Sequence, residues 1–116
     1  IIAGSNADIV VSIHQNSFSD SRVSGAQVFY YKHSVEGQKL AECIQDSMRE
    51  GLDETNDRKI KPNDSYYMLI HTPCPTVIVE CGFITNYDEA ALLVTEEYQK
   101  NVADAIAAGI MSYKRE

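Results

Sequence analysis

The stretch that decides the fold is Val77-Ile78-Val79-Glu80-Cys81-Gly82-Phe83. Its β-branched aliphatic residues, with a cysteine and a phenylalanine, predict a buried strand over residues 76–81. One acid, Glu80, interrupts this apolar run, and burying a carboxylate is unfavourable unless it is paired, binds a metal or is protonated. Glu80 therefore has two interpretations: an ion pair with a Lys or Arg of the 54–61 loop, or a functional group.

A second stretch, Asp8-Ile9-Val10-Val11-Ser12-Ile13-His14, has the same form, an apolar strand that ends on an ionisable side chain. Two such strands predict an active site at the carboxyl edge of a parallel sheet, where open α/β folds bind their ligands. His14 is either a strand-end histidine that hydrogen-bonds the backbone or a metal ligand through its neutral imidazole. For His33 and His71, expected at other strand ends, the first interpretation is the stronger one.

Periodicity and capping residues predict the remaining elements. Strands are expected over 7–14, 25–31, 66–70 and 76–81, helices over 35–53, 86–93 and 95–113, and loops over 16–24 and 54–65. The first and last helices carry apolar residues at helical spacing, with Ser34 and Thr95 as N-caps. Strands that alternate with helices predict an α/β fold, with a mostly parallel sheet flanked by helices in a single domain.

Composition narrows the possible classes of function. The chain has 116 residues and a net charge of −7, which argues against binding to nucleic acid or to anionic membranes by charge. No apolar run reaches the roughly 20 residues of a transmembrane helix, and no signal peptide is visible. The cysteines, Cys43, Cys74 and Cys81, form no C-x-x-C pair, so neither a disulfide framework nor a zinc knuckle is expected.

Together these stretches resemble the zinc-dependent N-acetylmuramoyl-L-alanine amidases of the amidase-3 type. The family's AD…SIHxN strand resembles residues 7–17, and its G-x-x-x-F/Y-Y strand resembles residues 25–31. Its P…VE.GF.SN block resembles residues 75–86. Within the family, the sequences of the spore-cortex subgroup are the most similar at two segments, Gln15-Asn16-Ser17-Phe18 and Gly25-Ala26-Gln27. The resemblance implies an amidase-3-like α/β sheet, peptidoglycan as the substrate, and an extracytoplasmic location at the cell wall or spore cortex.

The resemblance also implies the roles of single residues. The family holds one zinc with two histidines and a glutamate, and only His14 matches a ligand position here. The chain, which begins at Ile1, is therefore expected to be truncated at its N-terminus, to lack the family's first strand and helix, and to be inactive in isolation. Glu80 matches the residue that takes a proton from water and passes it to the leaving amine.

Substrate binding is expected of Asn16 and Arg58. From the residues alone, the segment Asn56-Asp57-Arg58-Lys59 is either a solvated turn or a clamp for substrate carboxylates. Ile70 stands where relatives often carry a basic residue. Two other functions stay open: a non-catalytic cell-wall-binding or regulatory module on the same fold, and another zinc carboxypeptidase-like hydrolase. Retention of both His14 and Glu80 disfavours the first, and the sequence around these two residues favours an amidase over the second.

Overall fold

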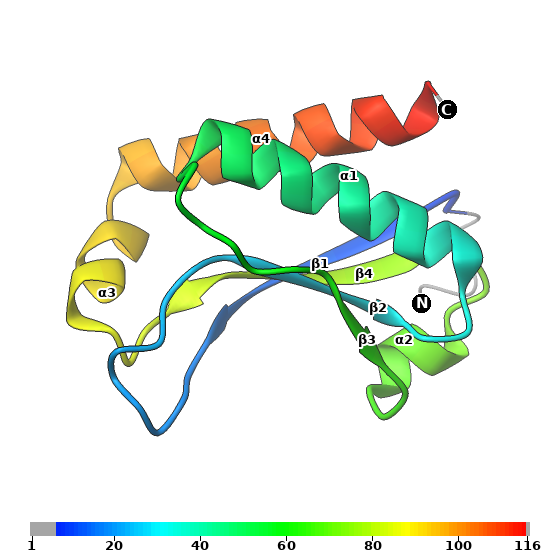
Figure 1. Cartoon of the computed structure of the whole chain (residues 1–116). Coiled ribbons are helices and arrows are strands. Elements are labelled where there is room, and N and C mark those ends of the chain that lie inside the picture. The colour runs from blue at the N-terminus through cyan, green and yellow to red at the C-terminus, as the bar shows by residue number, and fades with distance from the viewer. Residues whose placement is uncertain (1–6, 116) are drawn as a thin grey trace.

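The computed structural model describes residues 7–115, which form a single sheet with helices on both faces (Figure 1). This confirms the predicted α/β class. In chain order the elements are β1 (Val10–Asn16), β2 (Gln27–Tyr31), α1 (Val35–Gly51), β3 (Lys61–Asn63), α2 (Tyr67–His71), β4 (Thr76–Phe83), α3 (Tyr87–Leu93) and α4 (Glu96–Lys114).

The sheet brings together the two strands that carry His14 and Glu80, but neither residue ends its strand as predicted, because β1 continues to Asn16 and β4 to Phe83. Its order within the described residues is β1-β4-β2-β3. β1 and β4 run parallel, as do β2 and β3, whereas β2 and β4 run antiparallel. The prediction of a mostly parallel sheet is thus confirmed, with one antiparallel pairing at its centre. His14 is the register partner of Glu80, so the expected juxtaposition of these residues is also confirmed.

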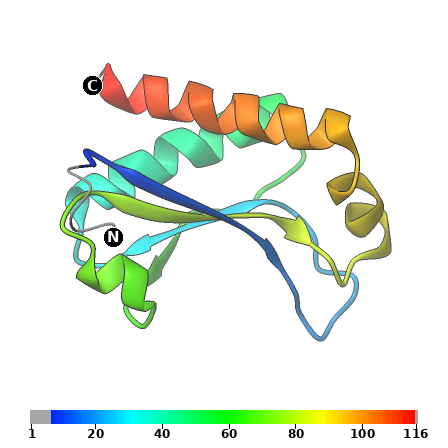
Figure 2. The ribbon, with the colours of Figure 1, turned by 180° about the vertical axis from the view of Figure 1, so that it is seen from behind.

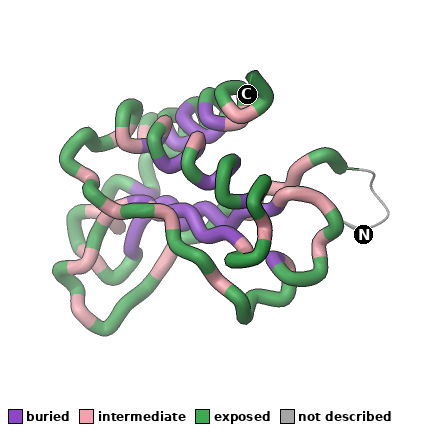
Figure 3. Tube along the Cα trace, turned by 45° about the vertical axis from the view of Figure 1, so that its right-hand side comes forward, coloured by how far each residue is buried: buried purple, intermediate pink, exposed green. Residues whose placement is uncertain are grey.

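The two long helices cover one face of the sheet. α1 and α4 lie side by side there, and their buried residues pack against Val28, Val77 and Val79 of the central strands. Figure 3 shows the buried residues concentrated in these strands and in the sides of the helices that face them. As predicted, Ser34 and Thr95 cap the two helices, each accepting a hydrogen bond from a backbone N–H of the first turn.

The opposite face is covered only in part. Strand residues alternate between faces, so Phe29 and Ile78 point away from α1 and α4 and pack against Leu69 of the short helix α2. Seen from behind, α2 lies on the far side of the sheet from the two long helices, and β1 is an edge strand (Figure 2). The remaining part of this face, which carries His14 and Glu80, is called the open face below.

The prediction of a strand over 66–70 is wrong. This segment belongs to α2, in which the N–H of Ile70 donates to the Tyr66 carbonyl (3.1 Å). Before it, the side chain of Asn63 accepts from the N–H groups of Ser65 and Tyr66, at 2.9 Å each, and so forms a turn. A run of five aromatic and aliphatic residues is too short to distinguish the period of a helix from the alternation of a strand. His71 therefore ends a helix rather than a strand.

The predicted loop over 54–65 is also partly wrong, because it contains β3. This strand pairs with β2 at the other edge of the sheet. Its middle residue is Pro62, which hid the strand from the sequence pattern. Proline is compatible with an edge strand because the N–H that it lacks would have faced away from the sheet.

We expect Gly109→Ala to destabilise the fold by about 1–3 kcal/mol, the usual range for overpacking. Gly109 is where α4 approaches α1, and a Cβ atom there would lie 2.6 Å from the Ile44 Cα atom. A backbone atom cannot yield without a shift of the helix. The matched control is Gly51→Ala, because a Cβ there would meet the Ala105 Cβ at an ordinary 3.6 Å. Thermal unfolding followed by circular dichroism checks both variants, and an unchanged midpoint for Gly109→Ala would contradict this packing.

Candidate active site

Glu80 and His14 come together because β1 and β4 pair in register. Neighbouring strands lie about 5 Å apart, and register partners point to the same face. The His14 imidazole is exposed, with Nε2 2.7 Å from the Ser12 hydroxyl oxygen. Glu80 is only 9% exposed, and its Oε2 atom is buried without a hydrogen-bond partner. The open face thus holds an accessible imidazole next to a largely buried carboxylate.

The environment of Glu80 favours its protonated form. Burial raises the pKa of Glu80 above its ordinary value, and the nearby His14 imidazole opposes this rise in part. Neither Arg58 nor Lys59 forms an ion pair with Glu80 within residues 7–115, so the structural ion-pair interpretation is wrong. A buried carboxylate atom without a partner is rare outside functional sites. A carboxylate in such a setting is suited to take a proton from a reacting group, as a general base does.

His14 is suited to be one ligand of a metal ion, but the other ligands are not in the described part of the chain. Within residues 7–115 no three His, Cys, Asp or Glu side chains are grouped so that they could hold a metal. A catalytic zinc takes three protein ligands. The rings of His33 and His71 lie against Tyr31 and Tyr67, with centroids 5.1 and 4.2 Å apart. The described residues therefore fit one position of a zinc site and do not complete it.

Gln27, which the sequence did not identify, connects Arg58 to the neighbourhood of Glu80. Gln27 is the register partner of Glu80 on β2, so its side chain is on the open face. The Gln27 carbonyl oxygen accepts from the Arg58 guanidinium (3.2 Å), and its amide nitrogen donates to the Lys59 carbonyl (2.8 Å). Arg58 also donates to the Ser24 carbonyl (2.7 Å) and lies over the Phe83 ring. The guanidinium is thus held in place by groups that carry no charge.

Asn16 is half-buried at the end of β1. Its side-chain oxygen accepts from the N–H of Ser17 (2.8 Å), and its carbonyl accepts from the N–H of Ile84 (2.8 Å). These bonds fix the start of the loop that follows β1 and leave the side-chain amide nitrogen available as a donor. A role in substrate binding for Asn16 stays a prediction, as does that for Arg58.

A second carboxylate, Glu89, holds the loops around the site together. It accepts from the N–H of Gly25 with both oxygens (3.0 and 2.9 Å) and from the N–H of Phe83 (2.8 Å). Gly25 has a φ of 104°, which residues with a Cβ rarely adopt. Asn86, the N-cap of α3, sets the first turn in which Glu89 lies. Glu89 thereby ties the start of β2 to the end of β4.

We expect Glu89→Ala to lower the free energy of unfolding by about 2–3 kcal/mol. The change leaves the N–H groups of Gly25 and Phe83 without their charged acceptor, and hydrogen bonds to charged groups are the stronger class. Asp88→Ala is the matched control, because Asp88 is an exposed acid in the same helical turn. Urea unfolding of both variants measures the difference, and equal midpoints would mean that Glu89 does not hold these loops.

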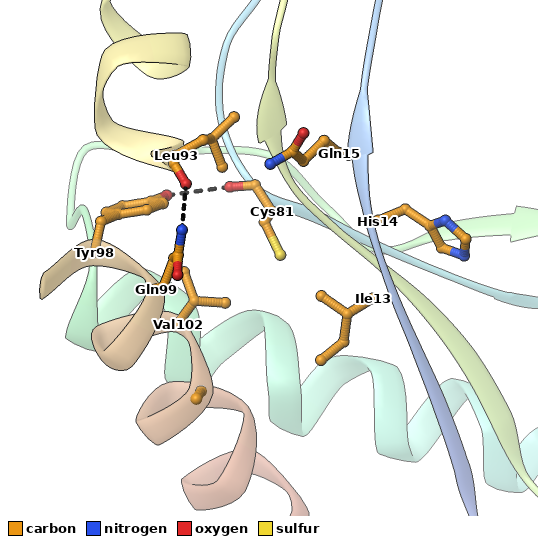
Figure 4. Close-up of a pocket in the computed structure, with 9 residues that line it drawn as sticks. Ile13, His14, Gln15, Cys81, Leu93, Tyr98, Gln99 and Val102 are labelled. Carbon is orange, nitrogen blue, oxygen red and sulfur yellow. Dashed lines mark hydrogen bonds between the residues drawn. The ribbon is translucent and has the colours of Figure 1, made fainter. Parts of the chain in front are cut away.

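A pocket in the described chain reaches His14 but lies mainly on the other face of β1 from Glu80. It has a volume of about 480 Å³ and lies on the helix-covered side of β1, between Ile13, Cys81 and Val102. Figure 4 shows Ile13 directed toward the pocket, while the ring of His14 lies on the far side of the strand. Burial raises the pKa of the Cys81 thiol to about 11, which agrees with its predicted role as a core residue.

Comparisons with known proteins identify a family match and similar sequences. Residues 1–112 match the Amidase_3 family, described as N-acetylmuramoyl-L-alanine amidase. The chain is 39% identical over 113 residues to the germination-specific N-acetylmuramoyl-L-alanine amidase of Bacillus subtilis (strain 168), which covers 97% of this chain and 47% of that protein. The chain therefore spans about half the length of the curated relatives that it matches.

Solved structures share the fold. The CwlD amidase from Clostridioides difficile, solved in complex with the GerS lipoprotein, superposes with a TM-score of 0.96 at 43% identity, covering 98% of this chain and 58% of that one. The N-acetylmuramoyl-L-alanine amidase from Clostridium difficile 630 gives a TM-score of 0.92 at 30% identity, covering 99% of this chain and 62% of that one. Among the described residues, no helix has the length and apolar character needed to cross a membrane.

Proposed function

The chain belongs to the Amidase_3 family of N-acetylmuramoyl-L-alanine amidases, and from this premise we propose that the complete protein is a zinc-dependent peptidoglycan hydrolase. Complete protein here means a chain of the length of its relatives. It cleaves the amide bond between N-acetylmuramic acid and L-alanine on the extracytoplasmic side of the cell. The observation that carries the proposal is the buried, unpartnered carboxylate of Glu80 in register with the exposed imidazole of His14.

His14 would hold the zinc through a ring nitrogen, and the Ser12 hydroxyl at Nε2 orients the ring. We propose that the other two ligands come from the part of the complete protein that this chain does not span. When bound, zinc supplies Lewis acidity that polarises a carbonyl and lowers the pKa of water to about 7. Such polarisation and activation would promote the attack of water on an amide carbonyl.

Glu80 moves the proton. Its Oε2 atom accepts a proton from the attacking water, and it returns that proton to the nitrogen of the leaving L-alanine as the amide bond breaks. The raised pKa of Glu80 suits this role, because a base is most effective when its pKa is near the working pH. Arg58 and Asn16 serve the substrate: the guanidinium binds a carboxylate of the peptide stem, and the amide nitrogen of Asn16 donates to the substrate backbone.

A sporulation role is the more specific part of the proposal. It is supported by the 39% identity to the germination-specific amidase of Bacillus subtilis. The substrate would then be cortex peptidoglycan. The chain carries a net charge of −7, so recognition of the anionic wall must depend on the local site rather than on overall charge.

The experiment incubates the zinc-loaded complete protein with purified, insoluble peptidoglycan and follows its solubilisation. We expect release of soluble peptide stems, which a metal chelator abolishes. A wall-binding or regulatory module would sediment with the peptidoglycan and release nothing. A carboxypeptidase would release single amino acids and leave the wall insoluble. Either result would overturn the proposal.

A further inference from the structure

An exposed aromatic surface borders the open face on the side of α2. Tyr67 is 77% exposed and Tyr66 is 42% exposed, although tyrosine rings are commonly more buried. The rings of Tyr67 and His71 stack, with centroids 4.2 Å apart and an interplanar angle of 34°. Tyr66 packs against the ring of Phe29 (6.2 Å). These three exposed rings, Tyr66, Tyr67 and His71, are called the aromatic platform below.

The platform has a fixed position relative to Glu80. Leu69 of α2 is buried against Ile78, and Ile78 precedes Glu80 by two residues on the same face of β4. Two residues along a strand span about 7 Å. Tyr67 and His71 each lie two positions from Leu69, which places them on the side of the helix away from the sheet. The aromatic platform thus lies at the α2 end of the open face, displaced from Glu80 toward the start of β4.

The opposite side of Glu80 is cationic. Arg58 lies at the carboxyl end of β4, where its guanidinium is 4.9 Å from the centroid of the Phe83 ring. It is bound to Gln27 and to the Ser24 carbonyl, and it forms no ion pair within residues 7–115. A positioned guanidinium without an anionic partner is a carboxylate-binding group. Glu80 therefore lies between an aromatic rim and a fixed cation.

The proposed substrate has the same asymmetry about the bond that breaks. One side of the amide is a sugar chain, whose pyranose rings present flat apolar C–H faces ringed by hydroxyl groups. The other side is a peptide stem that carries carboxylates. We propose that the substrate lies in one direction across the open face, with its sugar chain over the aromatic platform and its peptide stem over Arg58. This inference rests on the proposed amidase function and adds to it a glycan subsite on α2.

The chemistry of the platform favours sugar over peptide. Its rings are flat and accessible, and Tyr67 has a hydroxyl that can bond to sugar hydroxyls while its face packs on a sugar ring. Ile70, which follows in the same helix, adds exposed apolar surface and no charge. Lys61 lies 5.9 Å from the Phe29 ring centroid at the edge of this region and can donate to a hydroxyl. An extended glycan strand matches such a rim better than a short charged stem does.

The test measures how the complete protein binds two probes that it does not cleave. Chitohexaose represents the sugar chain, and L-alanyl-D-glutamate represents the stem; binding of each is measured by NMR titration. We expect Tyr67→Ala to weaken chitohexaose binding about fivefold to tenfold, the range for a lost aromatic contact. Tyr87→Ala is the matched control, since Tyr87 is 88% exposed at the start of α3, and we expect wild-type affinity.

The stem side has its own readout. We expect Arg58→Gln to weaken L-alanyl-D-glutamate more than chitohexaose, and the wild type to prefer the free dipeptide over its diamide. If Tyr67→Ala weakens the dipeptide instead, the direction of the substrate is reversed. If Tyr67→Ala and Tyr87→Ala bind chitohexaose equally, or the wild type does not bind it, the glycan subsite does not exist. Because neither probe is hydrolysed, these outcomes are independent of whether the protein releases stems from peptidoglycan, which tests the proposed function separately.

Discussion

Glu80→Gln should lower the turnover of the complete protein on peptidoglycan by roughly 10²–10⁴-fold, the usual effect of losing a general acid–base. Glutamine keeps the size and hydrogen-bonding capacity of the side chain but cannot take a proton from water. Zinc content should stay at the wild-type level, because the proposed ligand on this face is His14. Glu42→Gln is the matched control: Glu42 is an exposed acid on α1, on the other side of the sheet.

The outcomes separate three roles for Glu80. Loss of activity without loss of zinc fits a base. Loss of both would make Glu80 a ligand, and unchanged turnover would make it a structural acid. Steady-state kinetics and metal analysis of the same protein sample measure both properties.

The same substitution should stabilise the metal-free protein at neutral pH by about 1 kcal/mol, because it removes a buried carboxylate that has no partner. The sign follows from the raised pKa of Glu80. The folded state binds the proton more tightly than the unfolded state does, so stability is fully present below the unfolded pKa and is lost as pH rises through the folded pKa. The advantage of glutamine should therefore vanish at a pH below the pKa of the unfolded-state glutamate, where both folded and unfolded Glu80 are protonated. A less stable Glu80→Gln protein at pH 7 would show that the carboxylate has a stabilising partner.

His14→Ala should remove zinc and activity together. Deletion of a ligand empties a three-ligand site instead of slowing the reaction within it. His33→Ala is the matched control, because His33 is also exposed but lies against Tyr31. Metal analysis after dialysis, with turnover measured on the same samples, checks both variants. A His14→Ala protein that keeps stoichiometric zinc and is inactive would make His14 a catalytic group rather than a ligand.

The parts of the fold predicted best are those where burial and capping agree. Residues 76–83 are all buried, so the apolar run around Glu80 predicts its strand directly. Ser34 and Thr95 cap their helices as expected. The failures lie in 54–71, where local signals conflict with tertiary pairing. Pro62 argues against a strand, but β3 forms because it pairs with the edge of β2. The aromatic run that begins at Tyr66 argues for a strand, but the turn at Asn63 starts a helix there.

The candidate site was predictable where it depends on strand ends and not where it depends on long-range contacts. His14 and Glu80 lie in the carboxyl-terminal halves of two apolar strands, and the parallel pairing of these strands places the two residues in register. Gln27 and Glu89 gave no comparable signal. Gln27 matters because an antiparallel register places it beside Glu80, and Glu89 because it reaches Gly25 across 64 positions of sequence. In a sequence, an acid in a first helical turn usually indicates only a favourable interaction with the helix dipole.

The measurement that tests the central claim most directly is the identity of the bond that the complete, zinc-loaded protein breaks in purified peptidoglycan. Mass spectrometry and end-group labelling of the soluble products identify that bond. If Glu80 and His14 form the centre of an amidase, every product stem will carry a new amino terminus on L-alanine, and the glycan will retain intact muramoyl lactyl groups. New reducing sugar ends, or new amino termini at any other residue of the stem, would contradict the account.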